Sequence, residues 1–196
     1  MFPTLVWKLQ LQPTFRAALE PRILGVLESI RRGRPAAGEG WQSATTLHEL
    51  EELRELAACV DYAARTVLRF LHIGCNSLEI TGCWATVLGR GAPHRTHSHP
   101  NNFLSAVYYV RVHPGADTIN FHDPRVQTGI IRPPVTALTA ENTDQVVVKV
   151  TDGTLLLFPS WLQHSVDASA AEHERISISF NLMFPSFTER LAKPLW

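Results

Sequence analysis

Histidines in the second half of the chain are the residues best suited to chemistry. The sequence has nine histidines, and the densest group lies in the segment PHRTHSHPNN. His97 and His99 are two residues apart in it, so on an extended chain their side chains point to the same side. Two imidazoles on one face can bind one metal ion. The alternative is a polar loop with exposed histidines.

His164 is the candidate for a third ligand. It follows an apolar run and a Pro-Ser-Trp turn in GTLLLFPSWLQHSV, which predicts a strand, a turn and the start of the next strand. A histidine at that place can return to the open end of a β-barrel, where strands distant in sequence meet. We therefore expect His97, His99 and His164 to form one metal site.

Arg175 and Ser177 indicate a site for an anion. In the alternating segment RISISF they share one face, and the isoleucines occupy the other. An arginine that faces the interior of an apolar strand needs an anion. A guanidinium beside a hydroxyl suits a carboxylate, such as one end of a dicarboxylic acid. The alternative is a structural ion pair with Asp123 or Glu174.

The elements that must position these residues change character along the chain. Residues 14–73 are predicted to be helical, because apolar residues recur every three or four positions in two stretches. The segment RRGRPAAGEG between the stretches is expected to be a loop. The second helix is expected to begin at Thr45 or Thr46, with Glu49 three residues after Thr46 as in a capping box.

Short alternating or β-branched segments follow from about residue 76 to residue 186. They are LEITGCWATVL, FLSAVYYVRV, DTINFH, QVVVKV, GTLLLF and RISISFNLMF. Such spacing predicts an antiparallel sandwich or barrel, here an α+β fold in which the helical layer packs on the β part within a single domain, residues 1–196. Trp84 and Trp161 either line the mouth of this barrel or belong to its core.

Composition excludes several classes of protein. The chain has 196 residues, 45% hydrophobic and 18% charged, as is typical of a globular domain, and its formal net charge of +0 gives no basic surface for nucleic acid. Three cysteines without CxxC spacing favour free thiols in a reducing, cytoplasmic setting. We expect neither a signal peptide nor a membrane span.

Three parts of the sequence together resemble a known family. HSHPNNFLSAVYYV, INFHDPR and GTLLLFPSWLQHSV with RISISFN are similar to the Fe(II)/2-oxoglutarate-dependent oxygenases, and more narrowly to a group of small bacterial and phage proteins. The resemblance is most specific over residues 97–184 and extends to the opening MFPTLVWKL. It implies a double-stranded β-helix (jelly roll, cupin-like) whose site combines a His-x-Asp pair, a distal histidine and an arginine.

Transferred residue by residue, the resemblance implies that His97 and His164 bind iron. It also implies that Arg175 holds the distal carboxylate of 2-oxoglutarate, assisted by Ser177 and by the hydroxyl of Tyr109.

The chain departs from the broad family at position 99, where His99 replaces Asp or Glu. Three neutral ligands leave a divalent ion with a charge of about +2 and also suit zinc. Asp123 is the candidate for the missing carboxylate, either as a fourth ligand or as an acceptor from a ligand N–H.

The implied activity is that of a non-haem iron oxygenase. It would couple the oxidative decarboxylation of 2-oxoglutarate to hydroxylation, or a related C–H oxidation, of a small-molecule or peptide substrate, using Fe(II) and O2. A homodimer formed through the helical layer is compatible with this activity. The alternatives are a cupin-type three-histidine dioxygenase that does not use 2-oxoglutarate and a non-catalytic metal-binding module.

Overall fold

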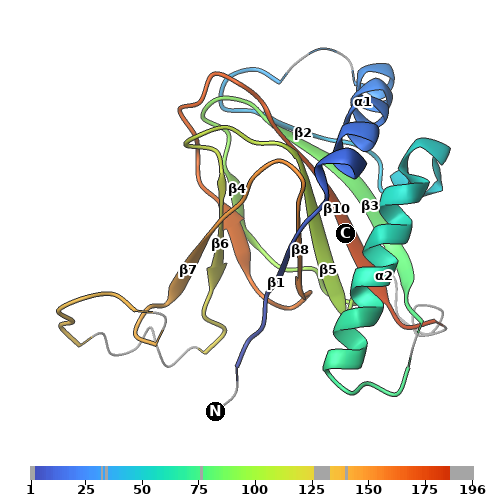
Figure 1. Ribbon diagram of the computed structural model, residues 1–196. Helices are drawn as coiled ribbons and strands as arrows, with labels where there is room; N and C mark the ends of the chain where they lie inside the picture. Colours follow the sequence, from blue (N-terminus) through green and yellow to red (C-terminus); the bar gives the residue numbers. More distant parts are fainter. Residues whose placement is uncertain are drawn as a thin grey trace.

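Two antiparallel β-sheets face each other at the centre of the protein (Figure 1). The computed structural model describes residues 3–31, 33, 35–75, 77–125, 133–139 and 141–185. In spatial order, the larger sheet consists of β1 (Trp7–Gln10), β8 (Thr154–Pro159), β5 (Leu104–Arg111), β10 (Arg175–Met183), β3 (Glu79–Leu88) and β2 (Gly40–Gln42). The smaller sheet consists of β4 (His94–His97), β9 (His164–Val166), β6 (Thr118–His122) and β7 (Gln145–Lys149).

Strands that are neighbours in these sheets are distant in sequence, as in a jelly roll. The strand order confirms the predicted antiparallel sandwich, and all six predicted strand segments are present as β3, β5, β6, β7, β8 and β10. The edge strands β1 and β2 were not predicted. They are only 4 and 3 residues long, and each exists because a longer strand, β8 or β3, offers it a hydrogen-bonding edge.

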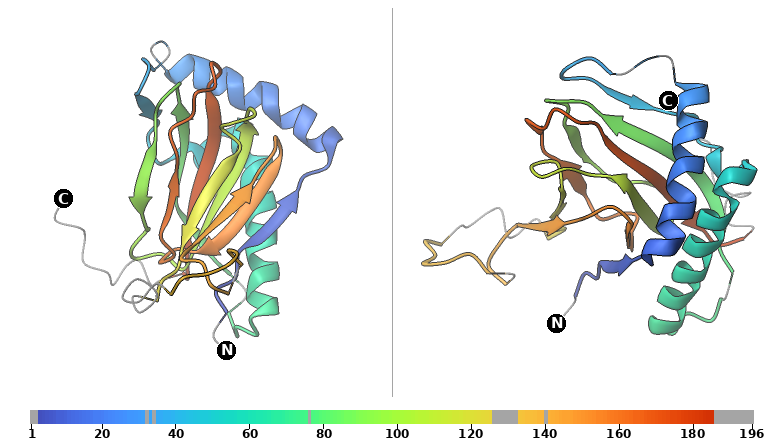
Figure 2. Two further views of the ribbon diagram at one scale, coloured as in Figure 1. Left: turned by 90° about the vertical axis from the view of Figure 1, so that its left-hand side faces the viewer. Right: turned by 45° about the horizontal axis from the view of Figure 1, so that its top comes forward.

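Two helices cover the outer face of the larger sheet (Figure 2). They are α1 (Pro13–Ile30) and α2 (Arg54–Phe70). Both form where apolar residues recur at helical spacing, and those residues enter the core against the sheet. The fully buried ones include Leu19, Ile23, Leu56 and Val60.

The predicted start of the second helix is wrong. Two short 3-10 turns, Leu47–Glu49 and Glu51–Leu53, precede α2, and Thr46 makes no capping hydrogen bond through its side chain. The cause is tertiary: Cys83 on β3 donates its backbone N–H to Thr45 at 2.7 Å. This long-range pairing ties the segment to β3 where the local pattern favoured a helix cap.

Alternation along the central strands separates the two sides of the larger sheet. On β3, Ala85 and Val87 belong to the core under the helices, whereas Trp84, Thr86 and Leu88 line a pocket between the two sheets. A second core, which includes the packed rings of Phe121 and Phe158, lies between the two sheets. Among the described residues, no helix is long and apolar enough to cross a membrane.

Candidate active site

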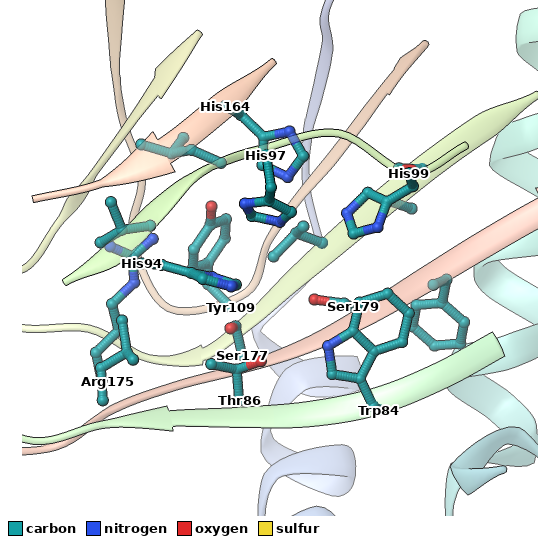
Figure 3. Close-up of a pocket in the computed structure, with 17 residues that line it drawn as sticks. Trp84, Thr86, His94, His97, His99, Tyr109, His164, Arg175, Ser177 and Ser179 are labelled. Carbon is teal, nitrogen blue, oxygen red and sulfur yellow. The ribbon is translucent and has the colours of Figure 1, made fainter. Parts of the chain in front are cut away.

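Three histidines converge at one end of the pocket, as their spacing predicts (Figure 3). His97 ends β4 and lies opposite His164, the first residue of β9. His99 follows two residues later, where its backbone N–H donates to Ser160 at 2.8 Å. The ligand atoms of the three rings all lie within 4.8 Å of one another. This group can hold one metal ion.

Backbone carbonyls orient two of these rings. Nδ1 of His97 lies 2.7 Å from the carbonyl oxygen of Arg95, and Nδ1 of His164 lies 2.9 Å from that of Leu162. A carbonyl can only accept, so Nδ1 of each ring donates to it and Nε2 is the nitrogen left to face a metal ion. Metal-binding histidines in proteins are commonly oriented in this way.

Burial keeps the imidazoles in the form that binds metal. It lowers the pKa of His99 to about 4 and that of His164 to about 3, and a charge on the neighbouring histidines would lower them further. Both rings are therefore uncharged at neutral pH. The set presents lone pairs without a carboxylate, so a divalent ion bound there would keep a charge of about +2.

Arg175 provides a buried cation in the same pocket. Its residue is 4% exposed, its Nη1 donates to the carbonyl of Thr118 at 2.7 Å, and its Cζ lies 5.1 Å from the centre of the Tyr109 ring. The structural ion pairs considered above are absent: Glu174 bonds Arg31 at 3.0 Å, and Asp123 bonds a different arginine. Within the part of the chain that the structure describes, Arg175 has no carboxylate partner.

Ser177 and Tyr109 lie beside Arg175, as expected. They are register partners on β10 and β5, and both line the pocket. The Tyr109 hydroxyl is buried and has no hydrogen-bond partner within the described part of the chain. Burial raises the pKa of this hydroxyl, so it remains a donor. The pocket is open to solvent, and its lining brings the three histidines together with Arg175, Ser177 and Tyr109.

Asp123 was a candidate either as a fourth ligand or as an acceptor from a ligand N–H, and among the described residues its carboxylate makes no hydrogen bond to His97, His99 or His164. The metal-binding group contains His97, His99 and His164 alone among the described residues. Both carboxylate oxygens of Asp123 accept hydrogen bonds from the guanidinium of Arg125, at distances from 2.6 to 3.2 Å. The Asp-Pro sequence is a turn in which the carboxylate has a local partner.

One residue of the pocket was not anticipated. His94 lines the pocket, and its ring centre lies 4.3 Å from that of His97. Its sequence signal is weak, because residues three apart on a regular strand point to opposite faces. Of the two tryptophans considered, Trp84 lines the pocket beside His99, whereas Trp161 is 54% exposed and is not among the residues that line it.

Taken together, the jelly roll, the three-histidine group and the buried arginine define a metal- and carboxylate-binding protein of the oxygenase type. Residues 82–181, more than half of the chain, match a protein family described as "Putative 2OG-Fe(II) oxygenase". The chain belongs to this family of enzymes, in which Fe(II) is the cofactor and 2-oxoglutarate the cosubstrate. No curated protein matches it.

Solved structures show the same fold. The non-haem carbocyclase SnoK from nogalamycin biosynthesis superposes with a TM-score of 0.67 at 17% identity, covering 98% of this chain and 89% of SnoK. HygX from Streptomyces hygroscopicus, solved with nickel and 2-oxoglutarate, gives 0.63 at 14% identity, with coverage of 94% and 84%. A Pseudomonas putida prolyl-4-hydroxylase gives 0.61 at 17%, with 92% of each chain covered.

Proposed function

We propose that His97, His99 and His164 hold Fe(II) and that Arg175 binds the distal carboxylate of 2-oxoglutarate in the same pocket. The observation that carries this proposal is the buried guanidinium of Arg175, which lacks a carboxylate partner among the described residues and lines the same pocket as the three histidines. A buried cation is costly unless an anion neutralises it. A dicarboxylic acid that also binds the metal supplies that anion.

Each residue of the pocket then has a defined task. The three imidazoles donate lone pairs to the ion, and two of them are oriented by carbonyl oxygens. Arg175 neutralises the distal carboxylate in a low-dielectric setting, where the attraction is strong. The Tyr109 hydroxyl, which has no hydrogen-bond partner among the described residues, donates to the same carboxylate, and Ser177 lies beside it. Bound iron would supply the activation of O2 that couples decarboxylation of the cosubstrate to oxidation of the substrate.

The substrate occupies the remaining side of the pocket, next to His99 and Trp84. The rings of these two residues lie 5.5 Å apart and form an aromatic wall. Because the same solvent-open pocket must also hold the cosubstrate, we propose a small molecule or one side chain of a peptide, and not nucleic acid. We further propose one domain, a cytoplasmic setting, and a homodimer formed through the helical layer.

Anaerobic titration with Fe(II) and 2-oxoglutarate tests this function. Binding of the oxoacid to Fe(II) through its keto and carboxylate oxygens gives a visible charge-transfer band, which we expect for the unaltered protein. His97→Ala and His164→Ala should abolish the band, whereas Asp123→Asn should keep it. A band of normal intensity in either histidine variant would reject the ligand assignment.

The three-histidine set itself favours one rival, a cupin-type dioxygenase that needs no 2-oxoglutarate. Such an enzyme would leave Arg175 buried without an anion, which is why we prefer the oxoacid. Oxygen consumption separates the two activities. Uptake that depends on 2-oxoglutarate and yields succinate supports the proposal, and uptake without the oxoacid supports the rival.

A further inference from the structure

Strand β4 is irregular between His94 and His97. Opposite β9, His94 pairs with Val166 and His97 pairs with His164, with a register shift between the two pairs. Three steps along β4 thus match two steps along β9, which is the geometry of a β-bulge. On a regular strand His94 and His97 would point to opposite faces. The bulge turns both into the pocket, while Arg95 and Thr96 between them are exposed.

The surroundings of His94 distinguish it from the three metal-binding histidines. Its ring lies between Arg175 and His97 in Figure 3, 4.3 Å from the ring centre of His97 and at 30° to its plane. It does not belong to the group whose ligand atoms converge. Among the described residues, neither ring nitrogen of His94 makes a hydrogen bond, whereas His97 and His164 each make one.

A partly buried imidazole without a partner, between a buried cation and a metal-binding group, suits an anionic ligand that spans the two. We propose that His94 donates an imidazole N–H to the carboxylate that Arg175 also binds, so that two side chains hold the distal end of the oxoacid. The bulge in β4 places His94 for this contact. The inference rests on the proposed function, because it takes 2-oxoglutarate as the ligand.

The test compares two oxoacids in anaerobic, Fe(II)-loaded protein. 2-Oxoglutarate and 2-oxopentanoate have the same length, but only the first has a distal carboxylate. The readouts are the dissociation constant of each acid, from the charge-transfer band, and that of Fe(II), from competition with a chelating dye. Activity is not needed. The variants are His94→Ala, His94→Gln, whose amide can still donate, and Thr96→Ala as an outward-facing control on the same strand.

His94→Ala should weaken 2-oxoglutarate binding about tenfold to hundredfold, the usual effect of losing a hydrogen bond to a charged group. Binding of 2-oxopentanoate and Fe(II) should change by less than about threefold, within the scatter of such measurements. His94→Gln should recover part of the loss, and Thr96→Ala should match the unaltered protein.

Three results would overturn the role of His94. Unchanged or tighter binding of 2-oxoglutarate to His94→Ala would mean that the ring merely fills space. If both oxoacids bound more weakly by the same factor, His94 would act at the metal end of the oxoacid. If His94→Ala lost its affinity for Fe(II), His94 would be a metal ligand. The proposed function fails separately: the unaltered protein would then give no band with 2-oxoglutarate, and the inference would fall with it.

Discussion

Replacing Arg175 with methionine should weaken 2-oxoglutarate binding without lowering the stability of the ligand-free protein. Methionine keeps much of the side-chain length, is apolar and adapts to irregular spaces. The substitution removes the guanidinium that is 4% exposed and has Thr118 as its hydrogen-bond acceptor. The substitution therefore shows whether the guanidinium of Arg175 serves to bind a ligand or to stabilise the fold.

The loss of affinity can be worked from the burial of the charge. Removing one partner of a buried, hydrogen-bonded charge pair costs about 2–5 kcal/mol of binding free energy. A value of about 3 kcal/mol corresponds to a dissociation constant for 2-oxoglutarate about 150-fold higher. Affinity for Fe(II) should be unchanged, because Arg175 contributes no ligand atom to the histidine group.

The effect of Arg175→Met on the stability of the ligand-free protein follows from the lack of a carboxylate partner for Arg175 among the described residues. A buried ion carries a desolvation penalty of several kcal/mol. Among the described residues, the hydrogen bond to Thr118 and the face of the Tyr109 ring are the contacts of Arg175 that offset this penalty. They contribute about 1–3 kcal/mol together. The unfolding free energy of Arg175→Met without ligand should therefore stay level or rise by about 1–2 kcal/mol.

Urea unfolding and the anaerobic titration measure the two quantities. Arg31→Met is the matched control, since Arg31 has a carboxylate partner in Glu174 at 3.0 Å and both side chains are largely buried. The control should lose about 1–3 kcal/mol of stability and keep its affinity for 2-oxoglutarate. Our reasoning is refuted if Arg175→Met behaves like this control, losing more than about 2 kcal/mol while still binding the oxoacid normally.

Three further outcomes are expected. Tyr109→Phe should weaken 2-oxoglutarate binding about tenfold without lowering the unfolding free energy, because the structure gives the lost hydroxyl no hydrogen-bond partner among the described residues; a clear drop in stability would point to a structural bond. Asp123→Asn should leave the affinities for Fe(II) and 2-oxoglutarate unchanged, because the carboxylate of Asp123 accepts hydrogen bonds from Arg125. A tenfold lower affinity of this variant for Fe(II) would indicate that Asp123 is a ligand after all. Burial raises the pKa of the Cys83 thiol from 9.0 to about 12. Above pH 9 the unfolded chain therefore releases a proton that the folded chain keeps. The unfolding free energy then falls by up to about 1.4 kcal/mol per pH unit. Urea unfolding from pH 8 to 10.5 should show a shallower fall for Cys83→Ala, and parallel falls for the two proteins would contradict the assignment.

Local patterns were sufficient for much of the fold. Alternation predicted the six long strands and put Arg175 and Ser177 on the face opposite their isoleucines, and the structure has both on the pocket side. The two-residue spacing of His97 and His99 likewise predicted that they would converge. These predictions succeed because the direction of a side chain on a regular strand depends only on its position along that strand.

Other features depend on contacts between distant segments, and the local patterns were misleading there. The capping-box pattern at Thr46 is overridden by a backbone hydrogen bond between Thr45 and Cys83. Asp123 resembled a ligand by residue type, but its carboxylate has a partner two residues away. His94 was missed because a bulge reverses the direction that a regular strand would give it.

The sequence alone determined which side chains could bind a metal and an oxoacid, and which strands carry them, because residue type and strand period are local properties. Only the tertiary structure decided that Arg175 has no carboxylate partner among the described residues and that His94 enters the pocket. Both facts depend on how β4, β9 and β10 are registered against one another. Register is set by pairing across the whole sandwich and cannot be obtained from any one segment.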